Sequence, residues 1–188
     1  MGPLKVQKNV DLARYSPGAY RPGSLVRRAL WYAVDLVFFS TPLPWPSIVK
    51  RNFLRAFGAE IGRGVVIKPR VQVKYPWFLR IGDHCWLGER VWIDNLATVE
   101  IGDHCCLSQG ALLLTGNHDW SSASFSLVCQ SITLENGVWI GARAVVTPGV
   151  VCGEHAVLSV GSVATKALDP RTVYTGNPAV AVKQRQIK

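Results

Sequence analysis

The stretch that decides the fold is IGDHCWLGERVWIDNLATVEIGDHCCLSQGAL, residues 81–112. An aliphatic residue recurs there every six positions, at Ile81, Leu87 and Ile93, and again at Ile101 and Leu107. The residue four positions after each of them is small or β-branched. Repetition at a fixed short period is typical of a solenoid, in which each repeat packs only against its neighbours.

The same period extends in both directions from this stretch. It begins with IGRGVVIKPRVQ at Ile61 and returns, after an interruption, as LENGVWIGARAVVTPGVVCGEHAVLSVGSV from Leu134 to Val163. A repeat unit of six residues, two of which point into the core, has the length of one short parallel strand and a corner. Three such units form a triangular coil, and coils stack about 4.8 Å apart. Ile61, Ile81 and Ile101 lie twenty residues apart and should therefore stack. The repeat predicts an all-β parallel β-helix.

The repeat also explains most cysteines and histidines. Five cysteines cannot all pair internally, and no CxxC spacing suggests zinc, so a reducing compartment is the simpler interpretation. We expect small inward core fillers at Cys85, Cys105 and Cys152. The histidines of the GDH and GEH turns occupy equivalent corners and are interpreted as scaffold: His84, His104 and His155.

The bulk composition fits one domain with a short appendage. The chain has 188 residues, of which 48% are hydrophobic, and a net charge of +9. Such a charge suits nucleic acid, an anionic membrane surface or a phosphate-rich cofactor. No nucleic-acid-binding motif accompanies the basic residues, so nucleic acid is not an expected partner.

The pattern divides the chain into three parts. Residues 1–60 form a partly helical capping segment, residues 61–168 the β-helix with a loop at about 117–133, and residues 169–188 a C-terminal tail. The longest apolar run of the first part, residues 29–39, is too short to cross a bilayer and contains Asp35. It fits a helix packed on the main domain or on a neighbouring subunit, which we favour, or one resting on a membrane surface beside Arg27 and Arg28.

The interruption, LTGNHDWSSASFSLVCQSI at residues 114–132, is long enough to leave the solenoid as a loop. Irregular segments on a rigid scaffold are where function concentrates. His118 lies at the foot of this loop, and its imidazole suits a general base. In an extended chain Asp119 would point away from His118, so the two should not form a dyad. The sequence does not identify the group that orients the imidazole, for which Glu135 is only a suggestion.

Several segments carry a resemblance across nearly the whole chain: LRAFGAEIGRGVVIKP, PWFLRIGDHCWLGERVWIDNLATVEIGDH, TGNHDW, VWIGARAVVTPGVVCGEHAVLSVGSVATK and GNPA. With them the chain resembles the hexapeptide-repeat acyltransferases, specifically the colanic-acid-type exopolysaccharide O-acetyltransferases related to maltose and galactoside acetyltransferases. The resemblance implies a left-handed β-helix and a homotrimer. It also implies that acetyl-CoA lies in a groove between neighbouring β-helices, with no metal required. The reducing compartment that the cysteines indicate suits a cytoplasmic enzyme. The basic, aromatic N-terminal segment would suit a lipid-linked acceptor at the inner face of the membrane.

The resemblance also assigns site residues. The catalytic histidine of the family falls on His118, and its acceptor-site asparagine on Asn95, which is equally well read as a corner residue satisfying the backbone. The donor positions fall on residues of the late coils: Ala142, Val160 and Thr165 along the thioester and pantetheine arm, and Lys166 and Lys183 near the phosphates. Two positions depart from the family pattern, because Val160 replaces the usual alanine and Val180 stands where arginine is common. Part of the adenine-end binding could then fall to Arg185.

The expected function is transfer of an acetyl group from acetyl-CoA to a sugar hydroxyl in exopolysaccharide or other glycan biosynthesis. The acceptor could be a lipid-linked glycan, a free oligosaccharide or a nucleotide sugar. Three alternatives stay open: N-acetylation of an amino sugar, a catalytically silent assembly subunit, and a zinc-dependent carbonic anhydrase on the same fold. The last needs a second histidine near the loop, but Ala123 stands five residues after His118.

Overall fold

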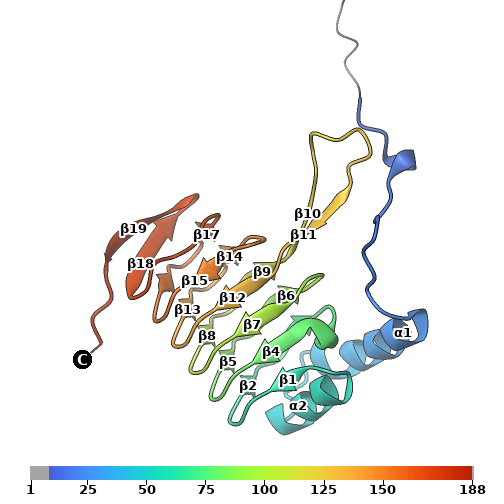
Figure 1. Ribbon diagram of the computed structural model, residues 1–188. Coiled ribbons are helices and arrows are strands. Elements are labelled where there is room, and N and C mark those ends of the chain that lie inside the picture. The colour runs from blue at the N-terminus through green and yellow to red at the C-terminus, as the bar shows by residue number, and fades with distance from the viewer. Residues whose placement is uncertain (1–8, 188) are drawn as a thin grey trace, which may run out of the picture.

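The computed structural model describes residues 9–187, so the first eight residues of the N-terminal segment and the last residue of the tail lie outside the description. Short parallel strands wind into a triangular prism with three faces (Figure 1). The first face contains β1 (Glu60–Ile61), β4 (Leu79–Ile81), β7 (Val99–Ile101), β12 (Ile132–Leu134) and β15 (Val151–Cys152). The second contains β2 (Val66–Ile67), β5 (Trp86–Leu87), β8 (Cys106–Leu107), β13 (Trp139–Ile140), β16 (Val157–Leu158) and β18 (Thr172–Gly176), with β19 (Ala179–Gln184) at its edge. The third contains β3 (Gln72–Val73), β6 (Trp92–Asp94), β9 (Leu112–Leu114), β14 (Val145–Val146) and β17 (Val163–Ala164).

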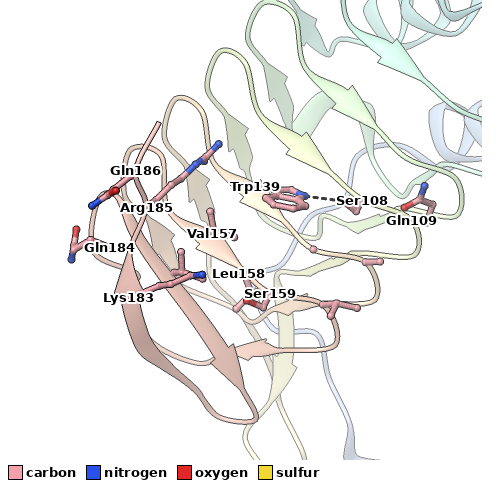
Figure 2. A pocket seen from close by; sticks show the side chains of 14 residues that line it. Ser108, Gln109, Trp139, Val157, Leu158, Ser159, Lys183, Gln184, Arg185 and Gln186 are labelled. Carbon is pink, nitrogen blue, oxygen red and sulfur yellow. Dashed lines mark hydrogen bonds between the residues drawn. The ribbon is translucent and has the colours of Figure 1, made fainter. Parts of the chain in front are cut away.

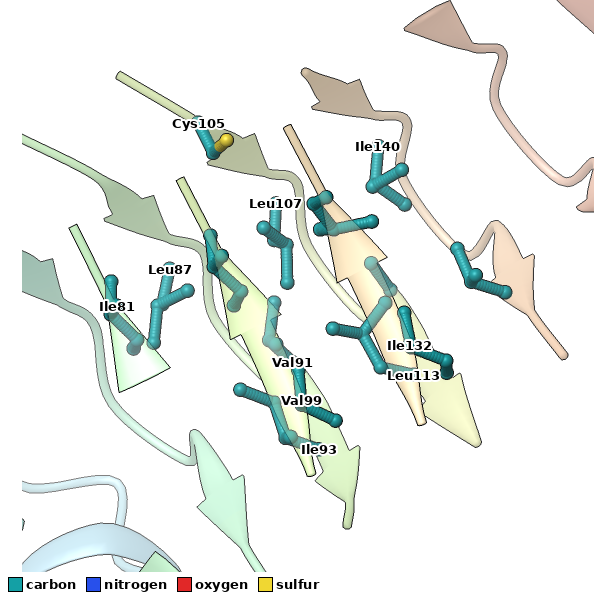
Figure 3. Packing of buried hydrophobic residues seen from close by; sticks show 14 of the residues in the cluster. Ile81, Leu87, Val91, Ile93, Val99, Cys105, Leu107, Leu113, Ile132 and Ile140 are labelled. Carbon is teal, nitrogen blue, oxygen red and sulfur yellow. The ribbon is translucent and has the colours of Figure 1, made fainter. Parts of the chain in front are cut away.

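The strand register follows the six-residue period. Ile81 pairs with Ile61 on one side and with Ile101 on the other, which confirms the predicted stack. Leu107 lies between Leu87 and Ile140 in the same way. These side chains belong to one buried core cluster inside the prism. Figure 3 shows Ile81, Leu87, Leu107 and Ile140 within it. The predicted all-β parallel β-helix is confirmed.

The corners repeat with the coils. His84, His104 and His155 occupy equivalent corners with positive φ angles of 56°, 57° and 58°. The rings of His84 and His104 stack with their centroids 5.4 Å apart. The structure thus confirms these histidines as repeated corner residues, and Cys85 and Cys105 as buried core fillers.

The hairpin corner is the corner that joins each third-face strand to the first-face strand of the next coil. It consists of residues 74–78, 95–98, 115–131, 147–150 and 165–167, and includes the 3₁₀ turn η3 (Pro76–Phe78). In a triangular prism this corner lies opposite the second face.

The N-terminal segment forms η1 (Leu12–Arg14), α1 (Leu25–Val34), the π-helical turn η2 (Asp35–Phe39) and α2 (Ser47–Ala56). Ser24 caps α1, because its side chain accepts a hydrogen bond from the Arg27 amide. The Trp31 indole donates to the Val73 carbonyl at 2.8 Å, and α2 buries Leu54 against the first coil. Burial of Lys50, whose Nζ donates to the Lys68 carbonyl at 2.8 Å, lowers the pKa of that amine. The inner side of the segment therefore packs on the first coil, as the favoured interpretation expected.

Within residues 9–187, no helix combines the length and the hydrophobicity that crossing a bilayer would require.

Candidate functional site

The interruption forms a β-hairpin that projects from the hairpin corner (Figure 1). Its base consists of β10 (Gly116–His118) and β11 (Leu127–Cys129), which pair antiparallel with His118 opposite Leu127. The sequence predicted a loop here, and the structure adds a hydrogen-bonded ladder at its foot. That ladder ties the position of His118 to the rigid solenoid.

The imidazole of His118 is held by a backbone carbonyl. Its Nδ1 lies 2.9 Å from the carbonyl oxygen of Phe125, and its ring stacks on the Phe125 ring with centroids 4.3 Å apart. A neutral imidazole carries one N–H. When Nδ1–H donates to this carbonyl, Nε2 is left as the proton acceptor, which is the form that a general base needs. The Tyr15 ring lies on another side, with its centroid 5.8 Å from that of His118.

The orienting group is therefore Phe125, and the suggestion of Glu135 was wrong. The Glu135 carboxylate instead accepts a hydrogen bond from the Glu154 amide at 2.7 Å. Phe125 has a φ of +47°, in the left-handed region that few non-glycine residues adopt. A backbone carbonyl leaves no side-chain signature, so the sequence could not identify it.

Asp119 forms no dyad with His118, which confirms the expectation. Its Oδ1 accepts hydrogen bonds from the Ser121 amide at 3.0 Å and from the Ser121 hydroxyl at 2.5 Å. These bonds hold the pKa of the carboxyl below its usual value. Asp119 therefore shapes the turn of the hairpin.

Asn95 also lies at the hairpin corner, yet it is 0% exposed. Its Oδ1 accepts from the Tyr75 amide at 3.0 Å, and its Nδ2 donates to the Tyr75 carbonyl at 2.7 Å. This arrangement favours the alternative of a corner asparagine that satisfies the backbone over a direct substrate contact.

The neighbouring Asp94 is the last residue of β6. Its side chain is 11% exposed and forms an ion pair with Lys74 at 2.9 Å. Tyr20 and Cys129 complete this polar cluster, which we define as Tyr20, Lys74, Asp94 and Cys129. Burial raises the pKa of Tyr20 most, and the nearby Tyr75, Cys129 and Asp94 add to the rise. The Cys129 thiol pKa is raised by burial and then by Asp94.

Sequence reasoning missed this cluster, although one signal was present. Asp94 is a carboxylate directly after an inward aliphatic residue of the repeat. The Tyr20 hydroxyl is buried without a hydrogen-bond partner among residues 9–187. A buried polar group without a partner is uncommon in folded proteins and invites a ligand or ordered water.

A groove of about 1080 Å³ runs along the second face, near its junction with the third. Three of the predicted donor residues line it: Ala142, Val160 and Lys183. Trp139 lines the same groove. Figure 2 shows it next to Ser108, to whose hydroxyl its indole nitrogen donates at 2.9 Å. The volume is in the range of sites that hold cofactor-sized ligands.

Arg185 also lines the groove and is anchored to the solenoid. Its Nη1 donates to the carbonyls of Gly137 at 2.9 Å and His155 at 3.1 Å. These bonds use only part of the guanidinium, which has five N–H donors. Together with Lys183 it makes one end of the groove cationic.

The other two predicted donor residues are not in this groove. Thr165 and Lys166 follow β17 and belong to the hairpin corner, where both are exposed. Within one chain the predicted donor residues therefore divide into two sets. One set lines the second face, and the other shares a corner with His118.

Within the described part of the chain, no three His, Cys, Asp or Glu side chains gather as a metal site would require.

The sequence and the fold match a known group of proteins. A family model described as the hexapeptide repeat of succinyl-transferase matches residues 79–114 and 131–166. The chain is 37% identical over 180 residues to the putative colanic acid biosynthesis acetyltransferase WcaF of Escherichia coli (strain K12), covering 93% of this chain and 97% of that protein. The chain belongs to the hexapeptide-repeat acetyltransferases.

More distant relatives share the fold. Galactoside O-acetyltransferase of Escherichia coli (strain K12) is 28% identical over 144 residues, covering 74% of this chain and 71% of that protein. The crystal structure of a hexapeptide-repeat acetyltransferase from Vibrio cholerae O1 biovar eltor, complexed with acetyl coenzyme A, matches with a TM-score of 0.79 at 22% identity. That match covers 93% of this chain and 97% of the other.

Proposed function

We propose that the protein is an O-acetyltransferase that moves the acetyl group of acetyl-CoA to a sugar hydroxyl in exopolysaccharide or other glycan biosynthesis. The observation that carries the proposal is His118, whose Nδ1 is held by the Phe125 carbonyl so that Nε2 is left as a base. The names of the two Escherichia coli relatives support acetyl transfer in colanic acid synthesis and to galactosides.

The groove on the second face suits the donor. Coenzyme A has a long pantetheine arm and several phosphate charges, and cationic side chains near the phosphates stabilise it. Lys183 and Arg185 supply such charges, and Ala142 and Val160 line the groove beside them. The acetyl coenzyme A bound to the Vibrio cholerae structure supports the same donor here.

The positions of the two sets of residues support a homotrimer with shared sites. His118, Thr165 and Lys166 lie at the hairpin corner, which is opposite the second face of the same prism. A donor in the groove of one chain would therefore meet His118 only from a neighbouring chain. A closed ring of three heterologous contacts would form three equivalent sites, each with residues of two protomers.

The chemistry follows from this arrangement. Nε2 of His118 takes the proton of the acceptor hydroxyl as the hydroxyl oxygen attacks the thioester carbonyl carbon. A backbone N–H at the groove stabilises the oxyanion that forms. The intermediate then expels the thiolate of coenzyme A, which takes the proton from the imidazolium. No metal is required for these steps.

The polar cluster is the proposed acceptor site. Lys74 and Cys129 belong to the hairpin corner, and Asp94 ends the third-face strand that leads into it. Thr165 and Lys166 lie at the same corner in the last coil. The carboxylate of Asp94 can accept hydrogen bonds from sugar hydroxyls, and the Tyr20 hydroxyl can donate to a sugar oxygen. A lipid-linked glycan, a free oligosaccharide and a nucleotide sugar all carry such groups.

The test is turnover with defined acceptors. Purified protein would be incubated with acetyl-CoA and sugars or amino sugars, thiol release would be recorded, and the products would be treated with mild base. We expect a base-labile ester on a sugar oxygen. A base-stable amide would favour the N-acetyltransferase alternative, and no thiol release with any acceptor would favour a silent assembly subunit.

Replacing Lys183 with glutamine tests the donor groove. We expect the KM for acetyl-CoA to rise about five- to tenfold with kcat nearly unchanged, because loss of a charge-assisted hydrogen bond costs roughly 1.5–3 kcal/mol when buried and less at an open groove. Steady-state kinetics at saturating acceptor measures it, with Lys68→Gln on an early coil as the matched control. An unchanged KM for acetyl-CoA would mean that the phosphates of coenzyme A do not bind at Lys183.

Replacing Asp94 with asparagine tests the acceptor site. The change keeps the shape of the side chain but removes the charge that strengthens hydrogen bonds from sugar hydroxyls. We expect the KM for the acceptor to rise roughly tenfold, while the KM for acetyl-CoA stays the same. Glu60→Gln removes an exposed carboxylate of the first coil and serves as control. Equal effects on both substrates would contradict an acceptor role.

A further inference from the structure

The helical segment 25–39, formed by α1 and η2, has an apolar outer face. Every exposed residue of the segment is aliphatic or aromatic: Leu25, Val26, Ala29, Leu30, Tyr32, Ala33, Leu36 and Val37. The polar residues turn to the sides. Arg27 lies over the Trp77 ring and donates to the Phe57 carbonyl, and Asp35 accepts a hydrogen bond from Ser40.

These exposed residues form one continuous strip. Residues 25, 29, 32 and 36 follow one another at helical spacing, and residues 26, 30, 33 and 37 form the adjacent row. The opposite side of the segment is apolar too, because Trp31 and Phe39 are buried on the first coil. A helix that is apolar on its outer as well as its inner face requires a second apolar environment. The strip continues past the helix through the exposed Leu43 and Ile48.

The charge of the chain around the strip indicates what kind of apolar environment would cover it. Residues 1–59 contain nine of the 21 basic residues but only two of the 12 acidic ones, which is a net +7 of the total +9. Arg14 and Arg21 are exposed in the stretch that leads to α1. The one acidic residue of the helix, Asp35, is half-buried, and burial raises the pKa of its carboxyl. The apolar strip thus belongs to a strongly cationic part of the chain.

We propose that the outer face of residues 25–39 docks on an anionic phospholipid bilayer and lies in its interface. Apolar side chains would enter the acyl boundary, and the flanking arginines would contact the phosphates. A symmetric contact between two copies of the chain fits less well, because it would bring two segments of charge +7 together.

The stretch of chain that leads to α1 connects the strip to the active-site hairpin. The Asp11 amide donates to the Ala123 carbonyl at 2.8 Å, and Tyr15 lies beside His118. Docking would thereby hold the N-terminal side of the hairpin corner near the membrane, where a lipid-linked acceptor is found. That consequence rests on the proposed function, whereas docking itself does not.

The experiment is co-sedimentation of the full-length protein with lipid vesicles. One set is made of phosphatidylcholine with phosphatidylglycerol, and the other of phosphatidylcholine alone. We expect binding to the anionic vesicles that weakens with added salt. The variant Leu30→Gln/Leu36→Gln should bind at least about tenfold more weakly, because it removes two side chains from the buried strip. Arg21→Gln should weaken binding about fivefold.

The matched control is Val180→Gln/Val182→Gln. Val180 and Val182 are 60% and 52% exposed on β19, compared with 57% and 60% for Leu30 and Leu36. This control should bind vesicles like the unsubstituted protein. The proposal is overturned if the unsubstituted protein stays in the supernatant, or if the leucine variant binds as well as the control. It is also overturned if the leucine variant instead lowers the molecular mass in sedimentation equilibrium, which would identify a contact between copies.

Activity on a water-soluble acceptor separates the two proposals. If the leucine variant loses vesicle binding but keeps thiol release, docking and catalysis are independent properties of the chain. Vesicle binding by a protein that has no transferase activity would retain the docking surface and refute the proposed function.

Discussion

Replacing His118 with alanine is expected to lower kcat for acetyl transfer by a factor on the order of 10² to 10⁴, with little change in either KM. The imidazole is the one base that the hairpin presents with a fixed free nitrogen, because the Phe125 carbonyl occupies Nδ1 and the Phe125 ring covers one side of the imidazole. A sugar hydroxyl is a poor nucleophile until a base takes its proton. Losing that base should therefore affect the transition state and leave ground-state binding of both substrates intact.

The experiment separates this role from a structural one. His104→Ala removes a corner imidazole of the same solenoid and should keep nearly full kcat. Sedimentation equilibrium and circular dichroism should show that both variants keep the fold and the oligomeric state. Added imidazole should restore part of the activity of His118→Ala only. A loss of kcat smaller than fivefold, or a rise in KM alone, would remove His118 from the chemical step.

Replacing Leu107 with alanine is expected to lower the free energy of unfolding by about 2–5 kcal/mol. Leu107 is fully buried in a central coil and lies in register between Leu87 and Ile140 (Figure 3). The coils above and below are held by ladder hydrogen bonds, such as those from the amides of Gly88 and Ser108. They cannot close in on the cavity, so both the lost burial and the empty volume contribute.

The neighbouring residue of the same strand provides the control. Cys106 is only half-buried, and Cys106→Ala should change the free energy of unfolding by less than about 1 kcal/mol. Urea denaturation at one protein concentration measures both variants, since assembly contributes to apparent stability. If Leu107→Ala were as mild as Cys106→Ala, a central role of the second face in the core would be contradicted.

Much of the fold could be predicted because the β-helix is nearly one-dimensional. Each coil contacts only the coils beside it, so a period of six in the sequence becomes a stack in space. The register of Ile61, Ile81 and Ile101, the burial of Cys85 and the corner role of His104 all follow from that period. The prominence of His118 also follows, because the hairpin is where the period fails.

The candidate site was less predictable because its details depend on pairings within an irregular segment. No side chain in the sequence indicates that the Phe125 carbonyl faces His118. This contact depends on the turn of the hairpin and on the positive φ of Phe125. Asn95 and Asp94 are adjacent, yet one is locked to Tyr75 and the other forms an ion pair with Lys74. Whether Asp94 or Asn95 faces the core depends on where β6 ends, and a shift of one residue would exchange the two.

The sequence by itself determined the solenoid, its triangular coil and the place where a loop leaves it, because those properties depend on local periodicity. Only the tertiary structure decided that the groove and His118 lie on opposite parts of one prism, that Phe125 orients the imidazole, and that the helix at residues 25–39 is apolar outside as well as inside. These features depend on which segments far apart in the chain come into contact. A repeat with a period of six residues does not encode such contacts.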